Sequence, residues 1–196
     1  MNDAPPDPLV ATLHILAEAA RELEDPWWVF GGAAMRLAGL DDLYVPDVDV
    51  MASPRDAQRL IEALHGRAVT DPGEGLFRSR IFGQILTTPV PIDVMGQMEV
   101  RSGADWSPVV FETRWPVEVQ GVVIPIPTIA EQIAVCRQFG RSKDLQRAEN
   151  GDPDPPAVLR GSGSAAPRTQ QAACDHAITD GLPGYWQGDA SLLVCA

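Results

Sequence analysis

The sequence of 196 residues predicts an α/β (α+β) domain in which helices flank a mixed β-sheet. Two kinds of segment alternate along it: stretches with apolar residues at helical spacing, and short apolar runs rich in valine, isoleucine and aromatic residues. Both patterns stop after Asn150, where proline, glycine and serine become frequent. We therefore predict one domain over residues 1–150, and a linker or disordered tail over residues 151–196.

The first half of the domain begins with an amphipathic helix over residues 9–23. A short strand over residues 27–30 follows, and the Gly31-Gly32 turn separates it from a helix over residues 33–40. The next strand covers residues 46–51. Ser53 then has the position of an N-cap, because proline follows it at the first helical position.

Four more strands are predicted, at residues 77–85, 90–94, 115–119 and 122–126. The last two flank Gln120-Gly121 and are typical of a hairpin. A capping box formed by Thr128 and Glu131 opens a final helix that runs to about Phe139.

The charge balance limits the range of partners. The formal net charge is −12, from 27 acidic and 15 basic residues, which argues against a broad electrostatic grip on nucleic acid but leaves room for a local basic groove. The three cysteines lie far apart and lack metal-ligand spacing, so neither a disulfide framework nor a zinc site is indicated. Because no apolar run approaches the ~18 residues of a membrane span, we expect a cytoplasmic protein without a membrane partner.

Three aspartates are the candidate chemical residues. Asp47 and Asp49 alternate with valines on one predicted strand, so both carboxylates face one side of it. Two such carboxylates repel each other unless they are solvated, paired with bases or bridged by a cation, and this pair by itself fits a structural role as well as a metal site. Asp93, in another apolar strand, is costly to bury unless a positive group meets it.

A magnesium site would explain the three carboxylates together. Mg²⁺ prefers oxygen ligands, and two ions ~3.5–4 Å apart can hold attacking and leaving oxygens in line. Asp47 and Asp49 would bridge the ions, while Asp93 would complete the ion nearer the attacking hydroxyl and help to deprotonate it. The backbone N–H groups of Gly31 and Gly32 would receive a triphosphate, although a Gly-Gly turn is more often purely structural.

The order of these motifs resembles a known superfamily. Phe30-Gly31-Gly32, then Asp47-Val48-Asp49-Val50, then Pro91-Ile92-Asp93-Val94 is similar to the signature of the nucleotidyltransferase fold. The segment from Phe139 to Leu145, with Lys143, resembles the abortive-infection and toxin-antitoxin type of nucleotidyltransferase. The resemblance covers roughly residues 26–150. It departs from the family at residues 43–46, which supply no basic residue before the first aspartate.

The resemblance implies a nucleotidyltransferase-like mixed sheet and Mg²⁺-dependent transfer of a nucleoside monophosphate from a nucleoside triphosphate, such as ATP, to a hydroxyl acceptor. It implies catalytic and metal-binding roles for Asp47, Asp49 and Asp93. Lys143 is expected near the nucleotide, with an exposed helical lysine as the alternative.

The acceptor stays open between tRNA, a protein hydroxyl and a small molecule. The protein would be the toxin-like member of a bacterial module, and a partner protein would supply acceptor-binding surface. The alternative is a catalytically inactive module of the same fold that binds nucleotides or proteins.

Overall fold

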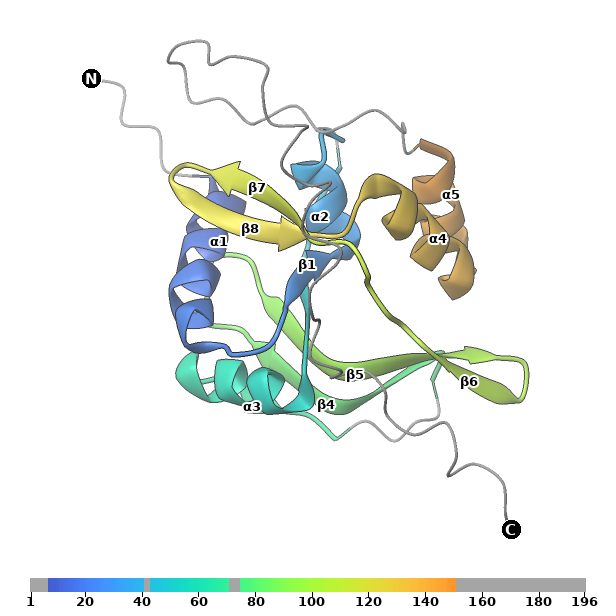
Figure 1. The fold of residues 1–196 in the computed structure, drawn as a ribbon, viewed down its shortest axis with the longest axis horizontal. Helices are drawn as coiled ribbons and strands as arrows, with labels where there is room; N and C mark the ends of the chain where they lie inside the picture. The colour runs from blue at the N-terminus through green and yellow to red at the C-terminus, as the bar shows by residue number, and fades with distance from the viewer. Residues whose placement is uncertain (1–6, 41–42, 71–74, 151–196) are drawn as a thin grey trace, which may run out of the picture. The chain divides into compact units, whose positions relative to one another are not determined.

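The computed structural model describes residues 7–40, 43–70 and 75–150, and its elements are labelled in Figure 1. The predicted tail over residues 151–196 lies outside the described residues, so it stays a prediction. Within the described residues, no helix combines the length and the apolar character needed to cross a membrane.

The main sheet has six strands and is mixed, which confirms the predicted fold class. Its order is β1-β2-β5-β4-β3, with β6 paired to β5; β2 and β5 are parallel, and the other pairs are antiparallel. The strands are β1 (Trp28–Phe30), β2 (Val48–Ala52), β3 (Arg67–Ala68), β4 (Phe77–Ile85), β5 (Ile92–Ser102) and β6 (Asp105–Pro108). The predicted hairpin is present as a separate two-stranded sheet, β7 (Trp115–Val119) and β8 (Val122–Ile126).

The helices of the described residues are α1 (Pro8–Ala19), which continues into a 3₁₀ turn (Ala20–Glu22), α2 (Gly31–Leu37), α3 (Pro54–Ala63), α4 (Ile129–Phe139) and α5 (Ser142–Asn150). Ser53 is the N-cap of α3, as predicted, and its Oγ accepts from the Asp56 N–H at 3.2 Å. Helix α2 begins at Gly31, two residues before the predicted start, because Gly31 itself makes the turn with a φ of 66°.

The two faces of the sheet bury different sets of residues. Alternate residues of β2 and β5, which include Val48, Val50 and Val94, pack with α1, α3 and the β7–β8 hairpin in one cluster. The residues between them face the other way, where Met95 belongs to a second cluster that includes Phe139 of α4. Asp49 and Asp93 therefore lie on the face that α4 shares.

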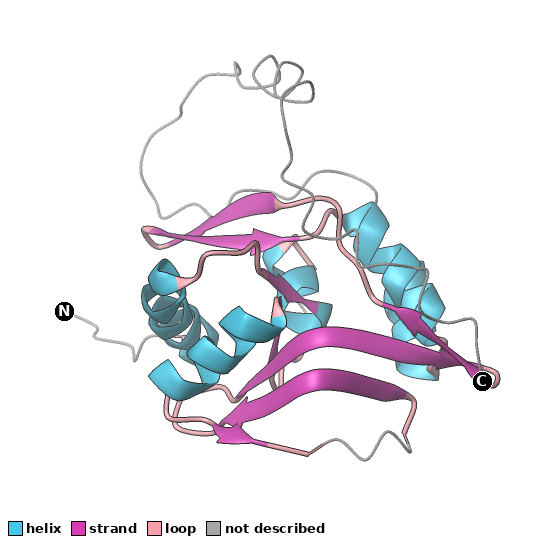
Figure 2. Ribbon diagram, turned by 60° about the horizontal axis from the view of Figure 1, so that its bottom comes forward, coloured by secondary structure: helices cyan, strands magenta, loops and turns pink. Residues whose placement is uncertain are grey.

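A left-handed residue changes the alternation of β5, which runs beside β4 along the sheet (Figure 2). Gln97 has a φ of 58°. Strict alternation from Asp93 and Met95 would place Gln97 on the same face, yet Gln97 is exposed and Met98 is buried instead. The face that carries Asp93 consequently continues through Met98 and its cross-strand partner Ser79.

Candidate active site

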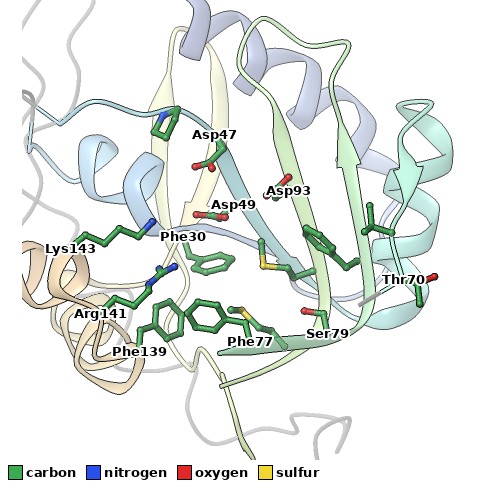
Figure 3. Close-up of a pocket in the computed structure, with 15 residues that line it drawn as sticks. Phe30, Asp47, Asp49, Thr70, Phe77, Ser79, Asp93, Phe139, Arg141 and Lys143 are labelled. Atoms are coloured by element: carbon green, nitrogen blue, oxygen red, sulfur yellow. The ribbon is translucent and has the colours of Figure 1, made fainter. Parts of the chain in front are cut away.

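The face that carries Asp49 and Asp93 opens into a cavity of about 410 Å³. Asp47, Asp49 and Asp93 all line this cavity, and Figure 3 shows them at the same end of it. Its volume is in the range of sites for small ligands.

Strand pairing brings two of the carboxylates together. Asp49 of β2 lies directly opposite Asp93 of β5 in the parallel register, so their backbones are about one strand spacing, ~4.8 Å, apart. Asp47 comes just before β2 and faces the same cavity. The alternation of residues along the strand predicts that Asp47 and Asp49 share a face. Only the pairing of β2 with β5 places Asp93 beside them.

Asp93 lies in an environment that favours its neutral form. Burial raises the pKa of Asp93, and the negative charge of Asp47 raises it further. The side-chain amide of Gln84 donates to Asp93 Oδ1 at 3.1 Å, which opposes this shift but does not reverse it. A cation at this end of the cavity would stabilise the charged form.

The two predicted glycines have different positions. A Cβ built on Gly31 would lie 2.6 Å from Asp49 Oδ2, and Gly31 lines a small adjoining cavity together with Asp49 and Arg141. Gly32 is buried and lines neither of these two cavities. Of the predicted glycine pair, the structure therefore brings Gly31 to the carboxylates.

Two cations reach the cavity, one from the connection between α4 and α5 and one from the first turn of α5. Gly140 ends α4 with a φ of 67°, and Arg141 and Lys143 follow it and line the cavity (Figure 3). Lys143, expected near the nucleotide, is exposed on α5 and lines the cavity that the three aspartates also line.

Arg141, which the sequence patterns do not single out, is held in a fixed position beside the cavity. Its guanidinium donates to both carboxylate oxygens of Asp144, a residue that is 1% exposed, with Nη2 to Oδ1 at 3.1 Å. It also lies over the rings of Phe77 and Phe139, at 4.6 and 5.6 Å from their centroids. The spacing of Arg141 and Asp144, three residues apart, is the sequence signal that could have revealed this pairing.

The donor atoms in the cavity suit magnesium, because the carboxylate oxygens are hard ligands. Among the residues that the structure describes, however, no three His, Cys, Asp or Glu side chains are gathered into a metal-binding group. Binding would therefore require the carboxylates to move together, which carboxylate rotamers allow.

No protein-family model and no curated protein sequence matches the chain. Among solved structures, a protein of Thermotoga maritima, TM1012, assigned as a nucleotidyltransferase, has a TM-score of 0.56 at 18% identity, over 70% of this chain and 88% of that one. The antibiotic-resistance factor ANT(2'')-Ia has a TM-score of 0.48 at 15% identity, over 71% and 80% of the two chains. The lincosamide antibiotic adenylyltransferase LnuA has a TM-score of 0.47 at 12% identity, over 72% and 96%. The mixed sheet, the order of the aspartate-bearing strands and the likeness to TM1012 together identify the nucleotidyltransferase fold in this chain.

Proposed function

We propose that the protein transfers a nucleoside monophosphate from a nucleoside triphosphate to a hydroxyl group, in a reaction that depends on Mg²⁺. The observation that carries the proposal is the in-register pair of Asp49 and Asp93, beside Asp47, in a cavity that Lys143 and Arg141 also line. Carboxylates and cations in one cavity suit a metal-bound triphosphate, which carries both kinds of charge.

The three aspartates divide the work by position. Asp47 and Asp49 would hold Mg²⁺ together with the triphosphate, and Asp93 would complete the metal site on the acceptor side. When bound, Mg²⁺ would neutralise the charge that develops on the phosphate oxygens. The raised pKa of Asp93 in the metal-free protein also suits a carboxylate that accepts the proton of the acceptor hydroxyl.

The cations and Gly31 would bind the phosphates. Lys143 provides a mobile point charge, while Arg141 provides a planar donor group that Asp144 and two phenylalanine rings hold in place. At Gly31 the backbone approaches Asp49 without a side chain, which leaves space for a phosphate beside the carboxylate. Gly32 follows Gly31 in the same turn and is buried, so we propose only its backbone N–H for the phosphates.

The acceptor is proposed to be a small molecule rather than tRNA, because the net charge of −12 disfavours a long polyanion. A protein hydroxyl is the second candidate. A toxin-like role in a bacterial module would require that the acceptor is a molecule essential to the cell. A partner protein could supply part of the acceptor-binding surface.

A catalytically inactive binding module is the rival function, and one specific observation favours it: the described carboxylates do not form a ready metal-binding group. Thermal-shift titrations with ATP, GTP, CTP or UTP, each with and without Mg²⁺, separate the two. Stabilisation that requires both nucleotide and metal supports the enzyme, while stabilisation by nucleotide without metal, or none at all, supports the rival. Incubation of the protein with each α-labelled nucleotide and a cell lysate then identifies the fraction that accepts the label.

A further inference from the structure

The cavity has an apolar wall that neither the triphosphate nor the metal would use. Phe82 and Met95 are cross-strand partners on β4 and β5, and both line the cavity next to Asp93. Met98 extends this wall along β5, whereas the ring of Phe77 is covered by the Arg141 guanidinium, 4.6 Å from the ring centroid. Met95 and Met98 are 7% and 6% exposed and belong to the packed core, and the partly buried Phe82 packs against it.

The wall is long because of the shifted alternation at Gln97. From Asp93 to Met98 the strand advances five residues, which at ~3.4 Å per residue is ~17 Å. Without the left-handed Gln97, a polar side chain would face the cavity where Met98 does now. Ser79, the cross-strand partner of Met98, adds a hydroxyl at the far part of the wall.

The position of the wall relative to the charges indicates which substrate it contacts. Arg141 directly precedes α5 and Lys143 lies in its first turn, whereas Asp93 and the apolar wall belong to β4 and β5 (Figure 3). In phosphoryl transfer the attacking and leaving oxygens lie roughly in line, on opposite sides of the phosphorus. If the cations hold the leaving pyrophosphate, the attacking hydroxyl approaches from the side of Asp93, and the rest of the acceptor lies along β4 and β5.

We propose that the acceptor is a small molecule that carries its hydroxyl on a flat apolar body, which binds along the wall formed by Phe82, Met95 and Met98. This inference rests on the proposed function. In the proposed transfer reaction, the acceptor oxygen forms a bond to the α-phosphorus of the nucleotide as the bond from that phosphorus to pyrophosphate breaks. The proton of the acceptor hydroxyl passes to Asp93. The products are the nucleotidylated acceptor and pyrophosphate.

Naphthylmethanol and glycerol are suitable probes, because both offer primary hydroxyls but only the former has a flat apolar body. Burial of a bicyclic ring predicts a preference for naphthylmethanol of roughly 10- to 100-fold in kcat/KM for transfer from the nucleotide that binds best. Saturation-transfer NMR of naphthylmethanol with the metal-free and nucleotide-free protein measures binding to the wall independently of transfer.

Substitutions at Ser79 test the location. Ser79→Trp fills the cavity beside Met98, so naphthylmethanol should lose its NMR signal and its preference. The affinity for the Mg²⁺-nucleotide should stay within about twofold, because the proposed nucleotide site is at Asp47, Asp49 and the two cations. Ser79→Leu is a smaller change that should give part of the effect if the tryptophan variant does not fold. Ser102→Trp, at an exposed position of β5, is the matched control and should behave as the wild type.

The outcomes separate the two claims. Transfer to lysate acceptors without a preference for naphthylmethanol overturns the inference and leaves the proposed function intact. A loss of nucleotide affinity in Ser79→Trp, with Ser102→Trp unchanged, also overturns it, because the wall would then hold the nucleoside. Binding of naphthylmethanol without transfer to any hydroxyl contradicts the proposed function and the acceptor role together.

Discussion

At position 31 the backbone lies so close to the Asp49 carboxylate that a methyl group would displace it. Gly31→Ala should therefore have two effects: a loss of about 1–2 kcal/mol of stability from the left-handed φ of 66°, and a weaker Mg²⁺-dependent affinity for nucleotide because Asp49 moves. Chemical denaturation and calorimetry measure the two effects separately.

Gly103→Ala is the control for this change. Gly103 has a nearly identical φ of 65°, and no atom lies within 4 Å of a Cβ built there. It should lose similar stability and keep its nucleotide affinity. Equal affinity in both variants would show that the contact between Gly31 and Asp49 does not matter for binding.

The environment of Asp93 predicts a pH dependence of stability in the metal-free protein. Because burial and the charge of Asp47 raise the pKa of Asp93 in the folded state, the folded protein holds this proton more tightly than the unfolded chain. Stability should therefore fall as the pH rises through the folded-state pKa, and Asp93→Asn should remove this loss.

Melting curves in the presence of a chelator test this dependence. Asp93→Asn should melt above the wild type at high pH, and the difference should shrink as the pH falls through the folded-state pKa and the wild-type carboxyl takes up its proton. Glu118→Gln, at an exposed position on β7, is the control. A difference in melting temperature that is independent of pH would contradict the assignment of the shift to Asp93.

Among the elements, the start of α4 differs from its prediction in detail. The helix begins where the capping box predicts, yet Thr128 makes no capping hydrogen bond and Glu131 does not reach back to it. Instead, the Glu131 carboxylate accepts from the backbone N–H groups of Glu112 and Thr113, at 2.6 and 3.2 Å, and from the Thr113 hydroxyl. The acid ties the β6–β7 connection to α4 because that connection runs past the helix start.

This arrangement predicts which substitution destabilises the protein more. Glu131→Ala should lose about 1–3 kcal/mol of stability, because it leaves several donors without their acceptor. Thr128→Ala should lose about 1 kcal/mol or less. Denaturant unfolding of both variants measures the difference, and a larger loss for Thr128→Ala would favour the conventional capping box.

The strands and helices with clear periodicity could be predicted, while shorter or more polar ones could not. Strand β4 and the hairpin match their predicted bounds, since apolar and β-branched or aromatic residues mark them. Helix α3 starts directly after its predicted N-cap, Ser53, which proline follows. The two residues of β3 and the four of β6 are too short to show a pattern, and they form strands only because β4 and β5 offer them an edge. Helix α5 is strongly polar along its length, so apolar spacing gives no signal for it.

For the molecule as a whole, the sequence predicted the aspartates of the candidate site but not the surfaces around them. Local alternation suffices for Asp47 and Asp49, and the apolar strand context singles out Asp93, but only the parallel pairing of β2 with β5 places Asp93 beside the other two. The apolar wall beside Asp93 depends on the pairing of β4 with β5 and on the left-handed Gln97. No local pattern encodes this wall, because it joins residues of two different strands. The pairing of Arg141 with Asp144, three residues apart, is local and does have a sequence signal.

The central claim is that the three aspartates carry metal-dependent nucleotidyl transfer, and Asp93→Asn tests it most directly. Measured in parallel, calorimetry with Mg²⁺ gives the nucleotide affinity, and a single-turnover assay gives the transfer rate to an acceptor found in the lysate experiment. We expect Asp93→Asn to lose ~10²-fold or more in rate with a much smaller change in affinity, because it removes a metal ligand and a base on the acceptor side. Asp49→Asn should weaken nucleotide binding as well, while Asp105→Asn, at an exposed position of β6, should match the wild type. Transfer by Asp93→Asn at the wild-type rate, or unchanged nucleotide binding in both site variants, would contradict the claim and favour the inactive module.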